Sequence, residues 1–229
     1  MSAPRFVIER YRDADCAELG RMHCELLGDP ERNGHSLATI GPDFMAEAFY
    51  RLSLDNPDFH CDVARLDERI IGFHVFTSRA DSVSSFLVRS HPVGLAVAAL
   101  RSIVRRPRSL VSILRNVRYL GGEQLPFLRG VRGWWIVAGV PGEYRSREFE
   151  ATIGGSIAHM MMARMEETFE RDGVSSWYVV VPPDNVPSTI FVQRCGARHA
   201  GTAAAQGKAM RYYVKRLGQT PEPVVGDGA

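Results

Sequence analysis

The chain has 229 residues, of which 45% are hydrophobic and 24% charged, with a formal net charge of +2. These values are typical of a soluble globular protein, and we expect one domain over residues 1–218 and a flexible Pro/Gly-rich tail over residues 219–229. No stretch reaches the roughly 18 to 20 apolar residues of a membrane span, and the N-terminus lacks an apolar signal core. We therefore expect a cytoplasmic protein that is not transmembrane.

The cysteines favour a reduced protein without a metal centre. Cys16, Cys24, Cys61 and Cys195 form no CxxC pair and lie in apolar-patterned segments. Such spacing favours buried thiols over a disulfide framework or a zinc site, so we expect no metal.

The N-terminal quarter predicts a strand and two helices. Residues 6–11 alternate as a strand, and Asp13 can cap a helix that runs to Leu27. His23 lies on the apolar stripe of this helix, which is more typical of a packed core histidine than of a catalytic base. A second amphipathic helix begins near Pro42.

Three further strands follow from the alternation of apolar side chains. Residues 60–66 and 69–77 form two strands, and Asp67-Glu68 between them predicts a tight hairpin. Near the end of the chain, residues 210–217 alternate well enough for a last strand, whereas residues 200–209 are small and polar.

Residues 82–132 contain a basic helical segment. Between residues 82 and 122 there is no Asp or Glu, whereas seven arginines lie there: Arg89, Arg101, Arg105, Arg106, Arg108, Arg115 and Arg118. Residues 93–104 and 109–119 predict two helices broken at Pro107. Four interpretations remain open: a dock for an acidic carrier protein, a membrane-surface helix pair, a lid over a site, or an ordinary packed insertion. No aromatic residues are interleaved with the arginines, so we expect no nucleic-acid partner.

A βαβ unit carries the strongest functional signal. Residues 134–138 and 177–181 are apolar strands, and Gly154-Gly155 precedes a helix over residues 156–171. The first N–H groups of a helix lack intrahelical partners, and the helix dipole favours negative charge there. The pattern therefore predicts a ligand that carries phosphate.

The same residues resemble a known family. Val140-Pro141-Gly142-Glu143-Tyr144-Arg145-Ser146 resembles the Val-Asp-Pro-Glu-Tyr-Arg-Gly run that closes the fourth strand of GNAT-superfamily N-acyltransferases. Thr152-Ile153-Gly154-Gly155-Ser156 is similar to the end of that family's Arg/Gln-x-x-Gly-x-Gly/Ala loop, with about four extra residues before it. From Asn185 to Ala197, the spacing of Ser188, Phe191 and Gly196 matches the family's late helix.

The resemblance implies an α/β (α+β) GNAT-like fold: a mixed central sheet of about six to seven strands flanked by helices, with residues 82–132 as a helical insertion between the third and fourth strands. It also implies a site for acetyl-CoA or another acyl-CoA. Backbone amides of Ala138, Gly139 and Val140 would bind the pantetheine arm and the thioester carbonyl. The loop that holds the diphosphate, together with the late helix, would contribute Arg145, Ser146, Arg147, Thr152, Ile153, Gly154, Gly155, Ser156 and Asn185.

Acceptor contacts are predicted less directly. In the family, the loop between the first two helices shapes the acceptor site, so Asn33 and His35 are candidates, although a solvated loop is the alternative. Trp134, at the start of the fourth strand, is a third candidate. The expected acceptor is a small-molecule or peptide amine. An acyl carrier protein is a candidate partner through the arginine-rich insertion, and a homodimer is left open.

The departures from the family pattern concern proton transfer. Val192 stands where many relatives have a tyrosine acid, and Val180 stands where some have a glutamate base. Among the remaining groups we favour Glu143 and His74 as catalytic candidates. We therefore expect a CoA-dependent N-acyltransferase that moves an acetyl or longer acyl group from a thioester to a weakly basic amine by direct attack. The alternative is a non-catalytic or carrier-docked GNAT-like module that binds an acyl thioester or a protein partner.

Overall fold

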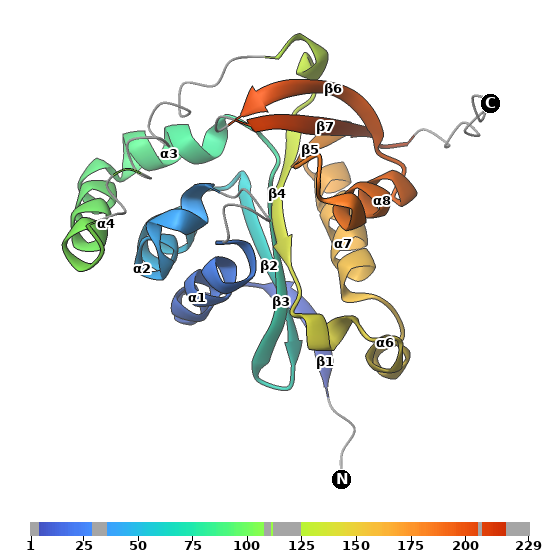
Figure 1. Cartoon of the computed structure of the whole chain (residues 1–229), viewed down its shortest axis with the longest axis horizontal. Helices are drawn as coiled ribbons and strands as arrows, with labels where there is room; N and C mark the ends of the chain where they lie inside the picture. The colour runs from blue at the N-terminus through green and yellow to red at the C-terminus, as the bar shows by residue number, and fades with distance from the viewer. Residues whose placement is uncertain (1–4, 29–35, 108–110, 112–124, 206–207, 219–229) are drawn as a thin grey trace.

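One seven-stranded sheet runs through the middle of the computed structural model (Figure 1), which describes residues 5–28, 36–107, 111, 125–205 and 208–218. The strand order is β1-β2-β3-β4-β5-β7-β6, and among these strands only β4 and β5 are parallel. The strands are β1 (Phe6–Arg10), β2 (Phe59–Leu66), β3 (Arg69–Thr77), β4 (Gly133–Gly139), β5 (Ser176–Val181), β6 (Arg198–Ala205) and β7 (Lys208–Arg216). This sheet confirms the predicted fold class, because it is mixed and has seven strands.

Helices cover both faces of the sheet (Figure 1). One layer contains α1 (Cys16–Leu27) and α2 (Pro42–Phe44), with α3 (Ser82–Ser90) and α4 (Pro92–Arg105) further out. The other layer contains α6 (Arg147–Ile153), α7 (Ile157–Arg171) and α8 (Val186–Arg194). The central strands are therefore buried on both sides, which explains why β2 and β3 are apolar over most of their lengths.

The core on the α1 side is aromatic. Phe59 and Phe73 are fully buried beneath α1 and the helical segment that follows α2. His23 is also fully buried; its Nδ1 lies 2.8 Å from the Tyr50 hydroxyl, and its ring stacks on Phe73. This confirms the prediction of a packed core histidine, and it leaves His23 with no access to a substrate.

The start of α1 differs from the prediction. A 3₁₀ turn over Asp13–Asp15 comes first, and the α-helix begins only at Cys16. Asp15, which is buried, accepts a hydrogen bond from the Arg12 N–H at 2.8 Å and pairs with the Arg65 guanidinium at 2.6 Å. Because Arg65, on β2 and remote in sequence, pairs with Asp15, it is Asp15 and not Asp13 that holds the start of the helix.

The insertion between β3 and β4 is helical, as predicted. α4 packs on α2 and on the helical segment that follows it, Met45–Tyr50, through Phe44, Ala48 and Ala98. The Ser102 hydroxyl donates to the Ile40 carbonyl at 3.0 Å. α3 is an additional helix that the sequence pattern does not predict. The helix expected over residues 109–119 lies outside the described residues except for Val111, and the tail over residues 219–229 lies wholly outside them.

The sheet edge at β6 also differs from the prediction. Residues 200–209 lack apolar alternation, yet β6 pairs with β7 from Arg198↔Val214 to Ala205↔Lys208. Main-chain hydrogen bonds to a neighbouring strand need no particular side chain, so a strand of small residues forms where β7 offers a free edge.

Candidate functional site

β4 and β5 diverge in the centre of the sheet. They pair at Gly133↔Trp177, Trp134↔Tyr178 and Trp135↔Val179, and the ladder ends there. Beyond that point β4 continues along β3 to Gly139, whereas β5 continues along β7 to Val181. The register of β3 against β4 skips Ile136, so a bulge bends β4 where the ladder stops. The two strands therefore form a wedge at the centre of the sheet.

The open edge of β4 is shaped by its last residues. Ala138 and Gly139 pair with His74 and Phe73 of β3, and no described strand pairs with their other edge. A Cβ built on Gly139 would lie 2.7 Å from Cε1 of Phe73 and 2.9 Å from Cδ1 of Leu26. Glycine is thus required for α1 and β3 to pack closely against the end of β4, beside the wedge.

Arg145 is bound to the backbone of the strand it follows. Its guanidinium donates through Nε to the Val140 carbonyl at 2.6 Å, and through a second nitrogen to the same oxygen. The side chain therefore closes the turn after β4. The family resemblance places Arg145 on a diphosphate, but the guanidinium binds the protein's own backbone instead.

The glycine turn before α7 also differs from the expected cradle. The N–H groups of Gly154 and Gly155 both donate to the Glu150 carbonyl, the latter at 2.8 Å, because α6 ends there with Gly154 at φ 84°. The extra residues in the loop thus form a helix, α6, which uses these two amides. Gly155 has φ 156°, and a Cβ on either glycine would meet nothing within 4 Å.

The free amides lie one residue further along, at the start of α7. Ser156 occupies the N-cap position, and the first backbone bond of the helix runs from Met160 N–H to the Ser156 carbonyl at 3.0 Å. By helix geometry, the N–H groups between them have no intrahelical acceptor. The amides available at this helix end are therefore those of residues 156–159 rather than those of the glycines.

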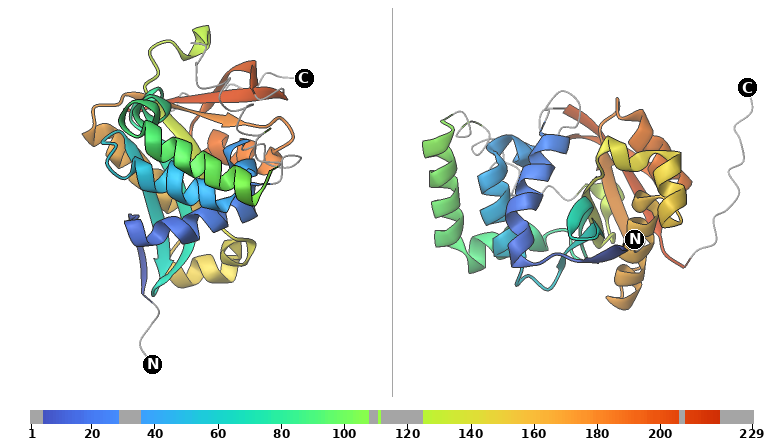
Figure 2. Two further views of the ribbon diagram at one scale, coloured as in Figure 1. Left: turned by 90° about the vertical axis from the view of Figure 1, so that its left-hand side faces the viewer. Right: turned by 90° about the horizontal axis from the view of Figure 1, so that it is seen from below.

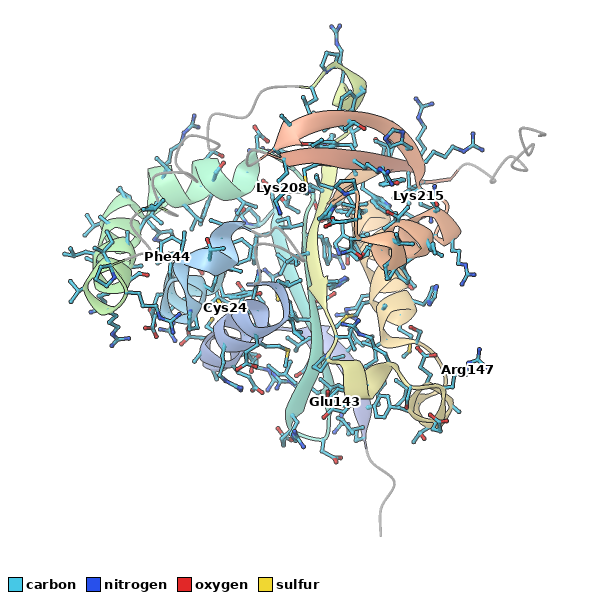
Figure 3. The ribbon with its side chains drawn as sticks, viewed as in Figure 1. Cys24, Phe44, Glu143, Arg147, Lys208 and Lys215 are labelled. Atoms are coloured by element: carbon cyan, nitrogen blue, oxygen red, sulfur yellow. The ribbon has the colours of Figure 1, made fainter. Side chains whose placement is uncertain are left out.

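The other predicted loop residues have local roles. The Ser146 hydroxyl caps α6 by accepting from Phe149 N–H, and the Thr152 hydroxyl donates to the Glu148 carbonyl. Ile153 packs in the cluster around Val140 and Ile157. Arg147 lies at the outer end of α6 and projects away from the sheet (Figure 3).

Asn185 stands at the N-cap of α8. Its side-chain carbonyl accepts a hydrogen bond from Ser188 N–H at 3.1 Å, which explains the Asn-x-x-Ser spacing without a ligand. Further along α8, the ring centroid of Phe191 lies 4.8 Å from that of His159. This contact joins α8 to the first turn of α7.

An aromatic stack lines the sheet on the face opposite α7. Trp134 stacks on Tyr178 at 5.8 Å with an interplanar angle of 4°, and the contacts continue to Tyr212 and Phe127. Burial raises the pKa of Tyr178 and of Tyr212, so both phenols stay protonated. The Trp134 Nε1–H is buried and has no hydrogen-bond partner in the described part of the chain. Of this stack, only Trp134 is predicted from the sequence as an acceptor contact. Tyr178 and Tyr212 could have been found from the alternation of residues along β5 and β7, which puts them on the same face of the sheet as Trp134.

Comparisons with known proteins agree with this geometry. No family model and no curated protein matches the sequence. Solved structures match over most of both chains. SsHAT has a TM-score of 0.60 at 15% identity and covers 93% of this chain and 98% of its own. A protein of the GNAT family from Desulfovibrio desulfuricans has a TM-score of 0.54 at 10% identity, with 93% and 99% covered. For yncA from Salmonella typhimurium, solved with its cofactor acetyl-CoA, the TM-score is 0.54 at 11% identity, with 97% and 99% covered.

The chain has the GNAT acetyltransferase fold. The order of elements along this fold places α3 and α4 between β3 and β4, as the resemblance implies.

Within the GNAT fold, His74 is held away from solvent. It is fully buried on β3, and its Nε2 lies 3.3 Å from Asp62 Oδ2, which the Arg164 Nε of α7 approaches to 3.0 Å. Burial alone would raise the pKa of Asp62, but the hydrogen bond from His74 and the charge of Arg164 outweigh it and lower that pKa. The His74 Nδ1 is buried and finds no hydrogen-bond partner among the residues that the structure describes. This cluster ties the sheet to α7.

The second catalytic candidate lies elsewhere. Glu143 belongs to the 3₁₀ turn Gly142–Arg145 after β4 and is exposed (Figure 3). No contact between described residues joins it to His74. Val192 is buried in the core under α8, so its side chain can only pack. The candidates Asn33 and His35 lie outside the described residues.

Proposed function

We propose that this protein is an acyl-CoA-dependent N-acyltransferase that moves an acetyl or longer acyl group to a weakly basic amine. The end of the β4–β5 ladder at Trp135↔Val179 carries the proposal, because it leaves an unpaired main-chain edge inside a sheet. A pantetheine arm is an extended chain with two amides, and it can add to such an edge as a strand would. Alternate amides among Ala138, Gly139 and Val140 face that edge, since consecutive residues of a strand direct their N–H groups to opposite sides.

The start of α7 supports a diphosphate site. The N–H groups of residues 156–159 and the helix dipole together favour a doubly charged anion there. Open space around Gly154 and Gly155 gives such an anion access. We place the diphosphate at these amides, one residue beyond the position expected from the sequence, with Arg147 as an exposed cation at the far, N-terminal end of α6.

The chemical step needs little from the side chains. The amine nitrogen attacks the thioester carbonyl, the C–S bond breaks, and the proton lost by the amine goes to the departing thiolate, which leaves as free CoA thiol. Amides on the β4 edge stabilise the oxygen that becomes negative. Losing a general acid or base typically lowers the rate about 10²- to 10⁴-fold. Val180, Val192 and the buried His74 therefore favour a slow enzyme.

The free-energy cost of deprotonating the amine restricts the choice of acceptor. An amine of pKa about 10.4 needs about 4.6 kcal/mol for deprotonation at pH 7, whereas one of pKa about 8 needs only about 1.4 kcal/mol. Because the described residues place no base at the wedge, we favour an α-amine, amino sugar or aryl amine. The stack of Trp134, Tyr178 and Tyr212 offers π-faces and hydroxyl groups that suit a planar or cationic amine.

The first experiment separates enzyme from binding module. Acetyl-CoA and longer acyl-CoAs are titrated into the protein by calorimetry, and thiol release is then followed with an amine panel. Saturable heat and steady thiol release support the enzyme. Saturable heat without thiol release would support the non-catalytic alternative, and the absence of heat at about 1 mM ligand would reject acyl-CoA as the ligand of either.

A pair of substitutions locates the diphosphate. Ser156→Asp keeps a good N-cap for α7 but places negative charge at the free amides. We expect an unchanged or higher thermal midpoint and CoA binding weakened about tenfold or more. Ser146→Asp makes the same change at the N-cap of α6. If Ser146→Asp weakened CoA binding more than Ser156→Asp, the diphosphate would lie over residues 145–147 and our placement would be wrong.

A further inference from the structure

The outer face of α4 carries a line of exposed aliphatic side chains. Val93, Val97, Leu100 and Val104 recur every three or four residues and therefore lie along one side of the helix. Their exposed fractions are 74%, 41%, 61% and 74%. We call these four residues the α4 stripe.

The α4 stripe is not needed for packing. The opposite side of α4 holds Ala98 and Ser102, which are both buried. Ala98 packs against α2 and the helical segment that follows it, and Ser102 donates to the Ile40 carbonyl. Small residues together with Leu95 thus attach the helix to the protein, and the four residues of the α4 stripe face outward. Among the described residues, six of the eight exposed large hydrophobic side chains lie between Val88 and Val111.

Positive charge borders the α4 stripe. Arg101 and Arg105 follow one flank of α4 at a spacing of four residues, and Arg89 is exposed near the end of α3. Arg105 pairs with Asp43 at 2.6 Å, but its side chain is still 65% exposed. No acidic residue occurs between residues 82 and 122, so α3 and α4 themselves carry no negative charge that opposes these arginines.

The position of α4 lets a flat surface reach it. Figures 1 and 2 show α4 as the outermost helix on its side of the molecule, with the sheet and α7 behind it. No single described helix is long and apolar enough to cross a membrane, although α3 and α4 together pass a test of length and composition as a pair bent by 96°. A helix that lies along an interface needs no such length.

We propose that α3 and α4 dock this protein onto an anionic lipid surface. The α4 stripe would enter the boundary between headgroups and acyl chains, while Arg89 and Arg101 contact lipid phosphates. A second copy of the chain fits less well, since a two-fold contact would oppose these arginines to their own copies. An acidic protein fits less well because protein hot spots are rich in aromatic residues, whereas the stripe is wholly aliphatic.

Vesicle flotation tests the proposal with the full chain. We expect binding to phosphatidylcholine vesicles that contain about one third phosphatidylglycerol, and weak binding to phosphatidylcholine alone or at high salt. Leu100→Gln/Val104→Gln should lower the partition coefficient about tenfold or more, since it removes half of the stripe. Arg89→Gln/Arg101→Gln should lower binding to the anionic vesicles only.

The matched control is Val186→Gln/Ile190→Gln on α8, which replaces two side chains of 56% and 45% exposure far from α4. It should leave vesicle binding unchanged, and thermal unfolding should show that all variants are folded. Three results would overturn the proposal: no binding at millimolar lipid, equal loss in the α4 and α8 variants, or vesicle-free binding through the stripe to an acidic carrier protein or a second copy. CoA binding by the same variants reports separately on the acyltransferase site.

Discussion

α7 and α4 are helices of 15 and 14 residues that use their apolar side chains in opposite ways. α7 directs Met161, Met165 and Phe169 into the sheet, where all three are fully buried. α4 directs Ala98 and Ser102 inward and leaves Leu100 and Val104 exposed. The large side chains of α7 therefore stabilise the fold and hold the N-terminus of α7 at the wedge. The exposed residues of the α4 stripe contribute little to folding and remain available for binding.

Truncation of a large side chain should give the greatest contrast. Met165→Ala in α7 should lower the free energy of unfolding by about 2–5 kcal/mol, because it leaves a cavity in a closed core. Leu100→Ala in α4 should change it by no more than about 0.5 kcal/mol. Urea titration followed by circular dichroism measures both. Similar losses for the two variants would mean that α4 is packed as tightly as α7.

Charge removal should sharpen the contrast within α7 itself. Arg164→Gln leaves Asp62 buried with only the bond from His74, and we expect a loss of about 1–3 kcal/mol. Arg171→Gln breaks an exposed pair with Asp172 at 3.4 Å and should cost at most about 0.5 kcal/mol. The same urea titration measures both. Equal effects would show that the His74–Asp62–Arg164 cluster does not anchor α7 to the sheet.

A pH titration examines the other end of α7. The His60 Nε2 lies 3.2 Å from the Ser78 hydroxyl and 3.2 Å from Asp172 at the end of α7. Burial lowers the pKa of His60, an effect that the nearby Asp172 charge only partly offsets. As the pH falls, the unfolded chain therefore binds a proton at His60 before the folded protein does. The neutral, buried His60 contributes its full stability above about pH 6.5, and this stability is lost as the pH falls through the lower pKa of His60 in the folded state.

Thermal midpoints at about pH 7.5 and pH 5.5 should therefore differ for the native protein, with the lower midpoint in acid. His60→Gln should show a smaller difference between the two pH values. His199→Gln, at an exposed position on β6, is the matched control and should keep the native difference. A native-sized difference in His60→Gln would assign the acid sensitivity to another group.

The local sequence pattern predicts those helices and strands whose apolar residues recur at a regular helical or strand spacing. α7, β4, β5 and the hairpin of β2 and β3 lie where the sequence places them. The wedge between β4 and β5 depends on strand pairing that no local pattern shows. β6 is not predicted, since its small residues carry no period and its formation depends on the edge of β7.

The site is less predictable than the fold, because hydrogen bonds decide which groups are free. Two glycines before a helix predict free amides, but α6 places the Glu150 carbonyl where it accepts from both. Arg145 similarly has a backbone acceptor, the Val140 carbonyl, that no motif reveals. The aromatic stack joins β4, β5 and β7, so its members are neighbours only after the sheet has formed.

The smallest expected effect concerns how α4 is attached. Arg105→Gln removes the pair with Asp43, whose side chains are 65% and 52% exposed, so we expect a loss of at most about 0.5–1 kcal/mol in urea titration. Arg101→Gln, one turn earlier, has no ion pair with a described residue and should have no measurable effect. Because Ala98 and Ser102 already seat α4 by packing and a hydrogen bond, neither variant should expose the core. A large loss in Arg105→Gln would mean that charge, and not this packing, fixes the insertion on the protein.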